Sequence, residues 1–353
     1  MNEKQKHLKT DAKIGILNRG EAALRFVRAV KEYNNLNGSQ LKSIAFYTEK
    51  EEYAPFVKMA DQALSLHSFP ELNKPGQSPY MNHDLLLQAL RHSGCDAVWV
   101  GWGFVSEDAD FTKKIEETGL VFLGPSSEAM ALLGDKIAAK DLAEKSDVPI
   151  LPWSKKAVRS YDEARKIAAE IGYPVIVKAA NAGGGRGIRF VRRPEELESQ
   201  FKSAREETIR ITGNDVVFIE YLVERGRHLE VQVLADQHGN VNTFGVRDCS
   251  VQRKNQKIIE ETPAPGFSED FMKDMEAAAA RLIKAADYSG AGTVEYLYDI
   301  KSERYFFMEV NTRLQVEYPI TETLYGVDLV RGQIDVARAK SSIFPTANPR
   351  GRS

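Results

Sequence analysis

The chain has 353 residues, of which 42% are apolar and 28% are charged, and its 48 basic and 50 acidic residues give a formal net charge of −2. This composition indicates a globular protein with two or three subdomains and excludes the disordered and fibrous classes. The balanced charge does not indicate nucleic acid or an anionic membrane as a partner, and no apolar run approaches the roughly 20 residues of a membrane-spanning helix.

The N-terminal residues 1–10 are polar and lysine-rich, so we expect a cytoplasmic protein. Cys95 and Cys249 are the two cysteines of the sequence. They form no Cys-x-x-Cys pair, which excludes a thiolate zinc site, and we expect both to stay reduced.

The first 125 residues alternate between short apolar segments and helical patterns. This alternation predicts an α/β fold with parallel strands flanked by helices. Gly101-Trp-Gly103 lacks the glycine spacing of a dinucleotide fingerprint, which argues against a nicotinamide cofactor. Strands are expected at 13–17, 41–47 and 97–100, and helices at 21–33 and 84–93.

The remainder of the chain begins with a helical pattern over 128–146, with a serine cap, and two prolines at 149 and 152 mark a linker. A strand at 174–178, a glycine loop at 182–187 and a strand at 188–191 predict a hairpin-like flap. The other expected elements are helices at 161–171 and 277–286 and strands at 215–220, 228–236, 240–245, 292–298 and 305–310.

The glycine loop follows Lys178 and carries Arg186, so its backbone N–H groups could cover phosphates, although a simple mobile turn is an equal alternative. It is not a P-loop, because the lysine precedes the glycines. Lys136 precedes the linker. A surface position is the alternative for either lysine alone, but both lysines and the flap together fit a nucleoside triphosphate held between subdomains.

Glu295 and Glu309 lie on the two arms of the expected 292–310 hairpin, where opposed positions are about 5 Å apart. Asn311 follows Glu309 on the same face. Two carboxylates and an amide form an oxygen-donor site that suits Mg²⁺ or Mn²⁺. A solvent-facing strand with surface ion pairs is the alternative.

The polar residues from Glu309 to Glu317 fall on every second position, which predicts one extended strand with these side chains on one face. The intervening apolar residues Val310, Leu314 and Val316 are expected to face the core. This face continues with Arg313, Gln315 and Glu317, and Lys257 is expected to join it. Arg313 and Lys257 can bind a small oxyanion, and Glu317 can act as a general base. Structural ion pairing among Arg313, Glu317 and Lys257 is the alternative.

Seven stretches, in this order, resemble the biotin carboxylase family of ATP-grasp enzymes over nearly the whole chain. They are Asn18–Glu21, Gly124–Ser126, Gly134–Lys136, Gly183–Gly187, Arg247–Ser250, Gly290–Glu295 and Asn311–Glu317. The resemblance implies a Rossmann-like N-terminal domain over 1–125 and an ATP-grasp domain over 126–340 with a mobile glycine-rich flap at about 150–222. A tail over 341–353 would precede the family's C-terminal subdomain.

The resemblance also implies the reaction, which is ATP-dependent carboxylation of biotin with bicarbonate through carboxyphosphate. The chain would be the biotin carboxylase part of an acyl-CoA carboxylase, with acetyl-CoA as the expected thioester. Implied partners are a biotin carboxyl carrier protein or domain, a carboxyltransferase component and further copies of the chain, with no nucleic acid and no membrane.

The family's site residues carry over to matching positions here. Two divalent ions, Mg²⁺ or Mn²⁺, would be bound by Glu295, Glu309 and Asn311. Bicarbonate would be bound by Lys257, Arg313, Gln315, Val316 and Glu317, of which Lys257, Arg313 and Glu317 would be catalytic. ATP would be bound by Lys136, Lys178, Gly184, Gly185, Arg186, Gly187, Glu220, Leu222, His228, Gln252, Leu297 and Glu309.

Several positions depart from the family pattern. Asn255 and Tyr318 replace usual histidines, and Trp102 replaces a commoner tyrosine, although Val98–Gly103 and Leu151–Trp153 are similar to large acetyl-CoA carboxylases. The sequence stops at Ser353, before the subdomain that supplies a biotin-facing arginine, so we expect a fragment or a chain completed by another polypeptide. The alternatives are an ATP-grasp ligase acting on another carboxylate or carbamate, and an inactive nucleotide-binding fragment.

Overall fold

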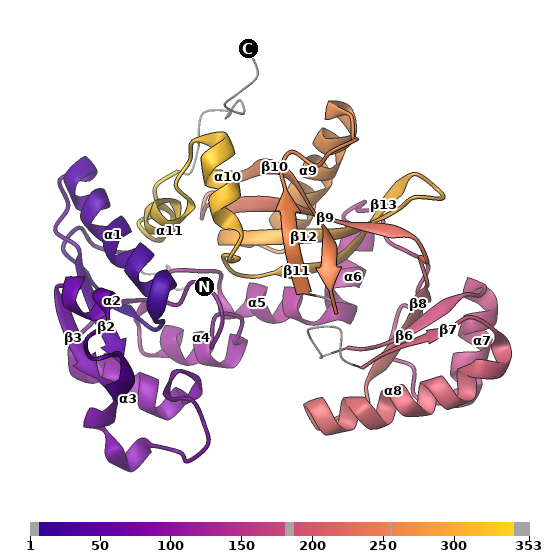
Figure 1. Cartoon of the computed structure of the whole chain (residues 1–353), viewed down its shortest axis with the longest axis horizontal. Coiled ribbons are helices and arrows are strands. Elements are labelled where there is room, and N and C mark those ends of the chain that lie inside the picture. The colour runs from indigo at the N-terminus through magenta and orange to yellow at the C-terminus, as the bar shows by residue number, and fades with distance from the viewer. Residues whose placement is uncertain (1–6, 181–186, 255, 342–353) are drawn as a thin grey trace, which may run out of the picture.

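Three β-sheets organise the chain in a computed structural model that describes residues 7–180, 187–254 and 256–341. A parallel sheet lies at one end of the molecule, a large antiparallel sheet lies in the middle, and a small antiparallel sheet lies at the other end (Figure 1). This arrangement confirms the predicted α/β fold class. The predicted limits of the two domains stay a prediction.

The N-terminal sheet has five parallel strands in the order β3-β2-β1-β4-β5. The sequence predicted β1, β2 and β4 but not the two edge strands, which are short and only partly buried. The strands are β1 (Lys13–Ile16), β2 (Lys42–Tyr47), β3 (Gln62–Ser65), β4 (Ala97–Trp99) and β5 (Val121–Phe122).

Helices cover both faces of this sheet, as parallel strands require. The Phe26 ring stacks on Trp99 of β4 with ring centroids 4.3 Å apart, so the apolar face of the first helix closes the core. That helix ends at Gly38, which adopts the left-handed conformation (φ 63°) that favours glycine. The helices are α1 (Gly20–Asn37), α2 (Pro55–Met59), α3 (His83–Ser93) and α4 (Ala109–Glu117).

The predicted helix over 128–146 is wrong as one element, because it is two helices, α5 (Ser127–Gly134) and α6 (Lys136–Lys145). Asp135 adopts an extended conformation between them, and its side chain accepts hydrogen bonds from the amides of Ile137 and Ala138. This is an N-cap, which starts a new helix. Lys136 therefore stands at the first position of α6.

The small sheet is antiparallel in the order β7-β6-β8, and it confirms the predicted strand–loop–strand hairpin. The loop residues 181–186 lie outside the described residues. Two helices, α7 (Tyr161–Ile171) and α8 (Leu197–Thr212), pack on this sheet (Figure 1). Its strands are β6 (Val175–Ala179), β7 (Ile188–Val191) and β8 (Val217–Tyr221).

The central sheet is antiparallel in the order β11-β10-β9-β12-β13. The predicted hairpin is confirmed, and its register places Glu295 directly opposite Glu309. The strands are β9 (Gly226–Ala235), β10 (Val241–Arg253), β11 (Gln256–Glu261), β12 (Gly290–Asp299) and β13 (Arg304–Asn311). The remaining helices are α9 (Glu269–Ala285), α10 (Tyr318–Tyr325) and α11 (Leu329–Ala337).

The predicted single strand from Glu309 to Glu317 is wrong, since β13 ends at Asn311 and residues 312–317 form a loop that leads into α10. Val316 is 62% exposed and does not face the core, whereas Leu314 is fully buried. The loop side chains are held by individual hydrogen bonds instead of by strand pairing.

Two further observations concern earlier expectations. Cys95 and Cys249 are both free and buried, which agrees with the expected reduced state. Within the described ranges, none of the helices combines the length and the apolar character needed to cross a membrane.

Candidate active site

A cleft of about 890 Å³ lies between the small sheet and the central sheet. Its walls come from α6, from all three strands of the small sheet, from every strand of the central sheet and from the loop 312–317. The cleft brings together the predicted residues Lys136, Lys178, His228, Gln252, Lys257, Glu295, Glu309, Asn311, Arg313, Gln315, Val316 and Glu317.

Lys257 on the edge strand β11 is the centre of a charge network. Its ammonium group donates to Glu230 at 2.6 Å, to Glu317 at 2.9 Å and to Glu295 at 3.1 Å. Burial would lower the pKa of Lys257, but its carboxylate partners outweigh burial and raise the pKa well above the ordinary value. Lys257 is therefore a fixed positive charge, and Glu317 beside it is held in place by a charge-assisted bond.

Arg247 of β10 supports this network from beneath and is fully buried. Its guanidinium donates to Glu230 at 2.6 Å and to Gln315 at 3.0 Å, and further donors reach Gln232, Thr293 and Thr321. The five donors of an arginine side chain can thus all be used. Arg247 fixes the direction of the Gln315 side chain in a segment that has no strand pairing.

Glu295, Glu309 and Asn311 supply the oxygen donors predicted to hold a metal. Strand register sets Glu295 opposite Glu309, and Asn311 donates to Glu295 at 2.8 Å. Burial would raise the pKa of Glu295, but His228 and Lys257 lower it far below the ordinary value. The carboxylate is thus ionised, and this oxygen donor set fits Mg²⁺ or Mn²⁺, which would bridge to substrate phosphates.

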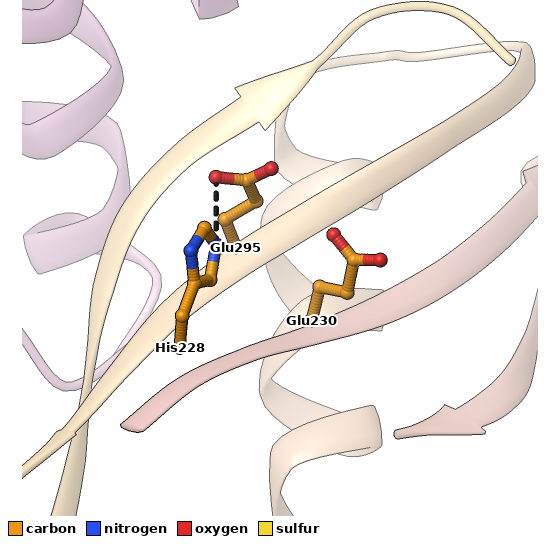
Figure 2. Close-up of side chains that lie close together, drawn as sticks. All are labelled: His228, Glu230 and Glu295. Carbon is orange, nitrogen blue, oxygen red and sulfur yellow. Dashed lines mark ion pairs between the residues drawn. The ribbon is translucent and has the colours of Figure 1, made fainter. Parts of the chain in front are cut away.

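A second group of potential ligands consists of His228, Glu230 and Glu295, whose ligand atoms lie within 4.8 Å of one another (Figure 2). Nε2 of His228 lies 2.9 Å from Glu295, but the two are not aligned as a hydrogen bond. Both oxygens of Glu230 are occupied by Arg247 and Lys257. These two cations disfavour a metal ion at this group. Glu295 and Glu309 also have lysine partners, Lys257 and Lys136, and their role as metal ligands stays a prediction.

The two predicted phosphate lysines have carboxylate partners on different sheets. Lys136 pairs with Glu309 at 3.0 Å, and Lys178 pairs with Glu220 at 2.6 Å. Glu220 was expected to contact ATP, but its side chain is 2% exposed and is shared between Lys178 and Lys140. Glu220 thus neutralises lysines beneath the cleft and does not line it.

Lys257 and Glu317 form an ion pair, as the alternative interpretation expected, but Arg313 does not join it. Arg313 pairs instead with Glu107 of the N-terminal region at 2.9 Å. A second cleft of about 840 Å³ shares Arg313, Glu309 and Lys136 with the first and is also lined by Glu107. The N-terminal region therefore contributes directly to the surroundings of the site.

The other predicted residues are not in the lining of the cleft or lie outside the described residues. Leu222 is 7% exposed, and Leu297 pairs in register with His228; neither is among the described residues that line the cleft. Gly187 adopts φ 69°, and a Cβ there would lie 2.7 Å from the Ala179 side chain, so glycine is required. The predicted ATP contacts Gly184, Gly185 and Arg186, and the departure Asn255, lie outside the described residues.

Sequence reasoning missed several residues of the site, namely Lys140, Glu230, Arg247, Glu260 and Glu107. Lys140 follows Lys136 by one helical turn, and Glu230 follows His228 on the same strand face, so the spacing held a signal for both. Tyr318, which replaces a usual histidine, is 2% exposed and packs against Trp102, with ring centroids 5.8 Å apart. Tyr318 is thus part of the core.

The chain is similar to known proteins over most of its length. Residues 10–130 match the biotin carboxylase N-terminal domain, and residues 135–342 match the carbamoyl-phosphate synthase L chain, ATP binding domain. Biotin carboxylase 1 of Bacillus subtilis is 42% identical over 325 residues, which are 92% of this chain and 70% of that protein.

Two solved structures have the same fold. The biotin carboxylase–βγ-ATP complex from Campylobacter jejuni aligns with TM-score 0.87 and 37% identity, covering 96% of this chain and 73% of that one. The biotin carboxylase domain dimer of Hydrogenobacter thermophilus 2-oxoglutarate carboxylase, in complex with MgADP, ADP and bicarbonate, aligns with TM-score 0.84 and 37% identity. It covers 93% of this chain and 70% of that one.

The parallel sheet, the two antiparallel sheets and the cleft of lysines and carboxylates between them define an ATP-grasp ligase. The matches to both family models and to the relatives go further. The chain belongs to the biotin carboxylase family. These relationships support ATP-dependent carboxylation of biotin as the reaction.

Proposed function

We propose that the cleft forms carboxyphosphate from MgATP and bicarbonate, as the first step of biotin carboxylation. The observation that carries this proposal is the 2.9 Å contact of Lys257 with Glu317, in a cleft that also holds the opposed carboxylates Glu295 and Glu309. The proposed base, a cation and the proposed metal ligands would thus surround one space. That combination suits the attack of a small oxyanion on a phosphate.

The bicarbonate site would consist of Lys257 on β11 and of side chains on the loop 312–317. Lys257 and Arg313 supply positive charge, and the amide of Gln315 is oriented by Arg247. Val316 is exposed at the cleft wall and would contribute its backbone or a packing surface. Glu317 would remove the bicarbonate proton, because the hydrogen bond from Lys257 at 2.9 Å holds its carboxylate in the cleft.

The oxyanion would then attack the γ-phosphorus, the bond from that phosphorus to the β–γ bridging oxygen would break, and ADP would leave. Lys136 and Lys178 would contact the phosphates, and two divalent ions at Glu295, Glu309 and Asn311 would offset their charge. His228, Gln252, Leu222 and Leu297 would surround the nucleoside. Gln252 donates to Nδ1 of His228 at 2.8 Å, which leaves the proton of a neutral imidazole on Nε2.

Carboxyphosphate would release CO₂ to a biotin ureido nitrogen, whose proton passes to the departing phosphate. Biotin would arrive on a carrier protein or domain, and a carboxyltransferase component would use the product. We propose acetyl-CoA as the thioester that the complex carboxylates, because the stretches Val98–Gly103 and Leu151–Trp153 are similar to large acetyl-CoA carboxylases. We also propose that the chain assembles as a homo-oligomer. Carboxylation assays of the complete complex with acetyl-CoA and propionyl-CoA would distinguish the thioesters.

The experiment that tests the site is ADP release with Mg²⁺, measured with and without bicarbonate. Bicarbonate is expected to stimulate release, and Glu317→Gln and Lys257→Met are each expected to abolish the stimulation while ATP still binds. Glu224→Gln is the matched control, because Glu224 is exposed and pairs with Arg192 at the surface. Full stimulation in both cleft variants would remove these residues from the mechanism.

A further inference from the structure

Lys140 is a buried cation that the proposed chemistry does not use. It lies on α6, one helical turn after Lys136, and its side chain is 2% exposed. Its ammonium group donates to Oε1 of Glu220, while Lys178 donates to Oε2 of the same carboxylate at 2.6 Å. Lys140 also lies 6.0 Å from the centre of the Trp153 ring. One carboxylate therefore holds two ammonium groups.

The three side chains differ in their access to the cleft. Lys140 and Glu220 are each 2% exposed, whereas Lys178 is 22% exposed and has the greater access to a ligand, although Lys140 also lies in the cleft wall. Burial would raise the pKa of Glu220, but Lys140 and Lys178 lower it to about 2. Burial lowers the pKa of Lys140, with Glu220 opposing this shift. The carboxylate is ionised and needs a cation at all times.

The charge balance of this group determines what Lys178 can do. With Lys140 present, two lysines share one carboxylate, so Lys178 is not the only partner of Glu220. Without Lys140, Lys178 would be the sole counter-ion of a buried carboxylate. Moving it toward a phosphate would leave that carboxylate unpaired in a low-dielectric environment, which is costly.

The position of Lys140 on α6 has a second effect. Lys136 on the same helix pairs with Glu309 of the central sheet, and Lys140 pairs with Glu220 of the small sheet. Consecutive turns of one helix are thus bonded to the two sheets that form the cleft. The spacing between Lys136 and Lys178 is set through these bonds.

We propose that Lys140 is a positioning residue that supplies Glu220 with a second cation, so that Lys178 is free to keep its place for the triphosphate. This inference rests on the proposed role of Lys178 in contacting ATP. A purely structural role is the competing explanation, because a buried ion pair also holds α6 against the small sheet. The two explanations differ in whether ATP affinity follows the charge balance or only the stability.

The test is titration calorimetry of MgATP on the full chain, with thermal unfolding of each variant. Lys140→Met is expected to weaken ATP binding at least tenfold and to leave the KM for bicarbonate unchanged. The double variant K140M/E220Q removes both buried charges, and we expect it to bind ATP more tightly than K140M alone. Lys145→Met is the control, because Lys145 is an exposed lysine on the same helix that pairs with Asp141.

The outcomes separate the inference from its premise. If Lys178→Met leaves ATP binding intact, the proposed role of Lys178 is wrong. If K178M weakens binding but K140M lowers only the melting temperature, Lys140 is structural and the inference is overturned. Should K140M fail to fold, the double variant decides the matter. If K140M/E220Q binds ATP clearly more tightly than K178M does, the inference is supported. If it binds ATP as weakly as K178M, the inference is overturned.

Discussion

Arg313 Nε donates to a carboxylate oxygen of Glu107 at 2.9 Å across 206 positions of sequence. Glu107 precedes α4 in the N-terminal region, whereas Arg313 lies in the loop after β13. The same guanidinium donates weakly to Asn311 at 3.4 Å. The parallel-sheet region therefore helps to set the direction of the Arg313 side chain, which is a proposed bicarbonate ligand.

We expect Glu107→Gln to raise the KM for bicarbonate about two- to fivefold with little change in kcat, since a partly exposed ion pair is worth about 1 kcal/mol or less. The measurement is bicarbonate-dependent ADP release. Asp110→Asn is the control, because Asp110 lines the same second cleft and is exposed. An unchanged KM in E107Q would show that Arg313 keeps its position without this partner.

Arg247→Met is predicted to destabilise the chain strongly. The substitution leaves the buried carboxylate of Glu230 with only Lys257 and removes the partner of Gln315. Breaking a buried ion pair costs about 3–5 kcal/mol. Urea unfolding should show this loss, whereas Arg192→Met, at an exposed arginine, should change the free energy of unfolding by about 0.5 kcal/mol or less. Equal effects in the two variants would contradict the burial argument.

The metal site predicts a specific change in Mg²⁺ dependence. Glu309→Gln removes a charged ligand and leaves Lys136 without its carboxylate, so the Mg²⁺ concentration for half-maximal ATP turnover should rise about tenfold or more. Removing divalent ions with EDTA should abolish turnover in the parent chain. A Mg²⁺ titration of Glu224→Gln serves as the control. Parent-like Mg²⁺ dependence in E309Q would place the metal elsewhere.

Glu260 on β11 lines the cleft, and its protonation should make stability depend on pH. Burial, together with the charges of Glu317 and Glu230, raises the pKa of Glu260 from 4.5 to about 7. Between these values the folded chain holds a proton that the unfolded chain has lost. Stability therefore falls as pH rises through this window, and the contribution is present in full only below about 4.5.

We expect Glu260→Gln to remove about 1–2 kcal/mol of this fall, a figure reduced for solvent screening of a partly exposed group. The measurement is urea unfolding of both proteins from pH 4.5 to 8. Glu261→Gln, at the exposed neighbour, should follow the parent curve. Parallel curves for E260Q and the parent would mean that Glu260 titrates alike in the folded and unfolded chains.

The sequence predicted the elements that local patterns determine. Apolar alternation located the β12–β13 hairpin, but Glu295 pairs with Glu309 only because the register shifts between Glu295 and Tyr296, which the sequence pattern did not predict. Strand and helix alternation likewise predicted the parallel sheet. The edge strand β5 has only two residues, Val121–Phe122, so it left no periodic signal.

The same patterns gave wrong secondary-structure predictions where hydrogen bonds of individual side chains, and not a continuous helix or strand, determine the path of the chain. Polar residues continue at every second position after Asn311, but Arg247 and Lys257 hold Gln315 and Glu317 individually, so no strand is needed. The helical pattern also runs through 134–135, where Asp135 caps a new helix. Partners far apart in sequence, such as Lys140 and Glu220, could not be found from one sequence.

The register of β12 with β13 determines the spacing of Glu295 and Glu309 by backbone pairing within a single hairpin. Lys178 belongs to a different sheet, which joins the rest of the molecule through α6 and connecting segments (Figure 1). A rotation of the small sheet against α6 would have to separate Lys140 from Glu220, and it would move Lys178 without changing the spacing of the two carboxylates. The distance between the two carboxylates thus depends on one hairpin alone, whereas the distance from either of them to Lys178 depends on how two sheets are held together.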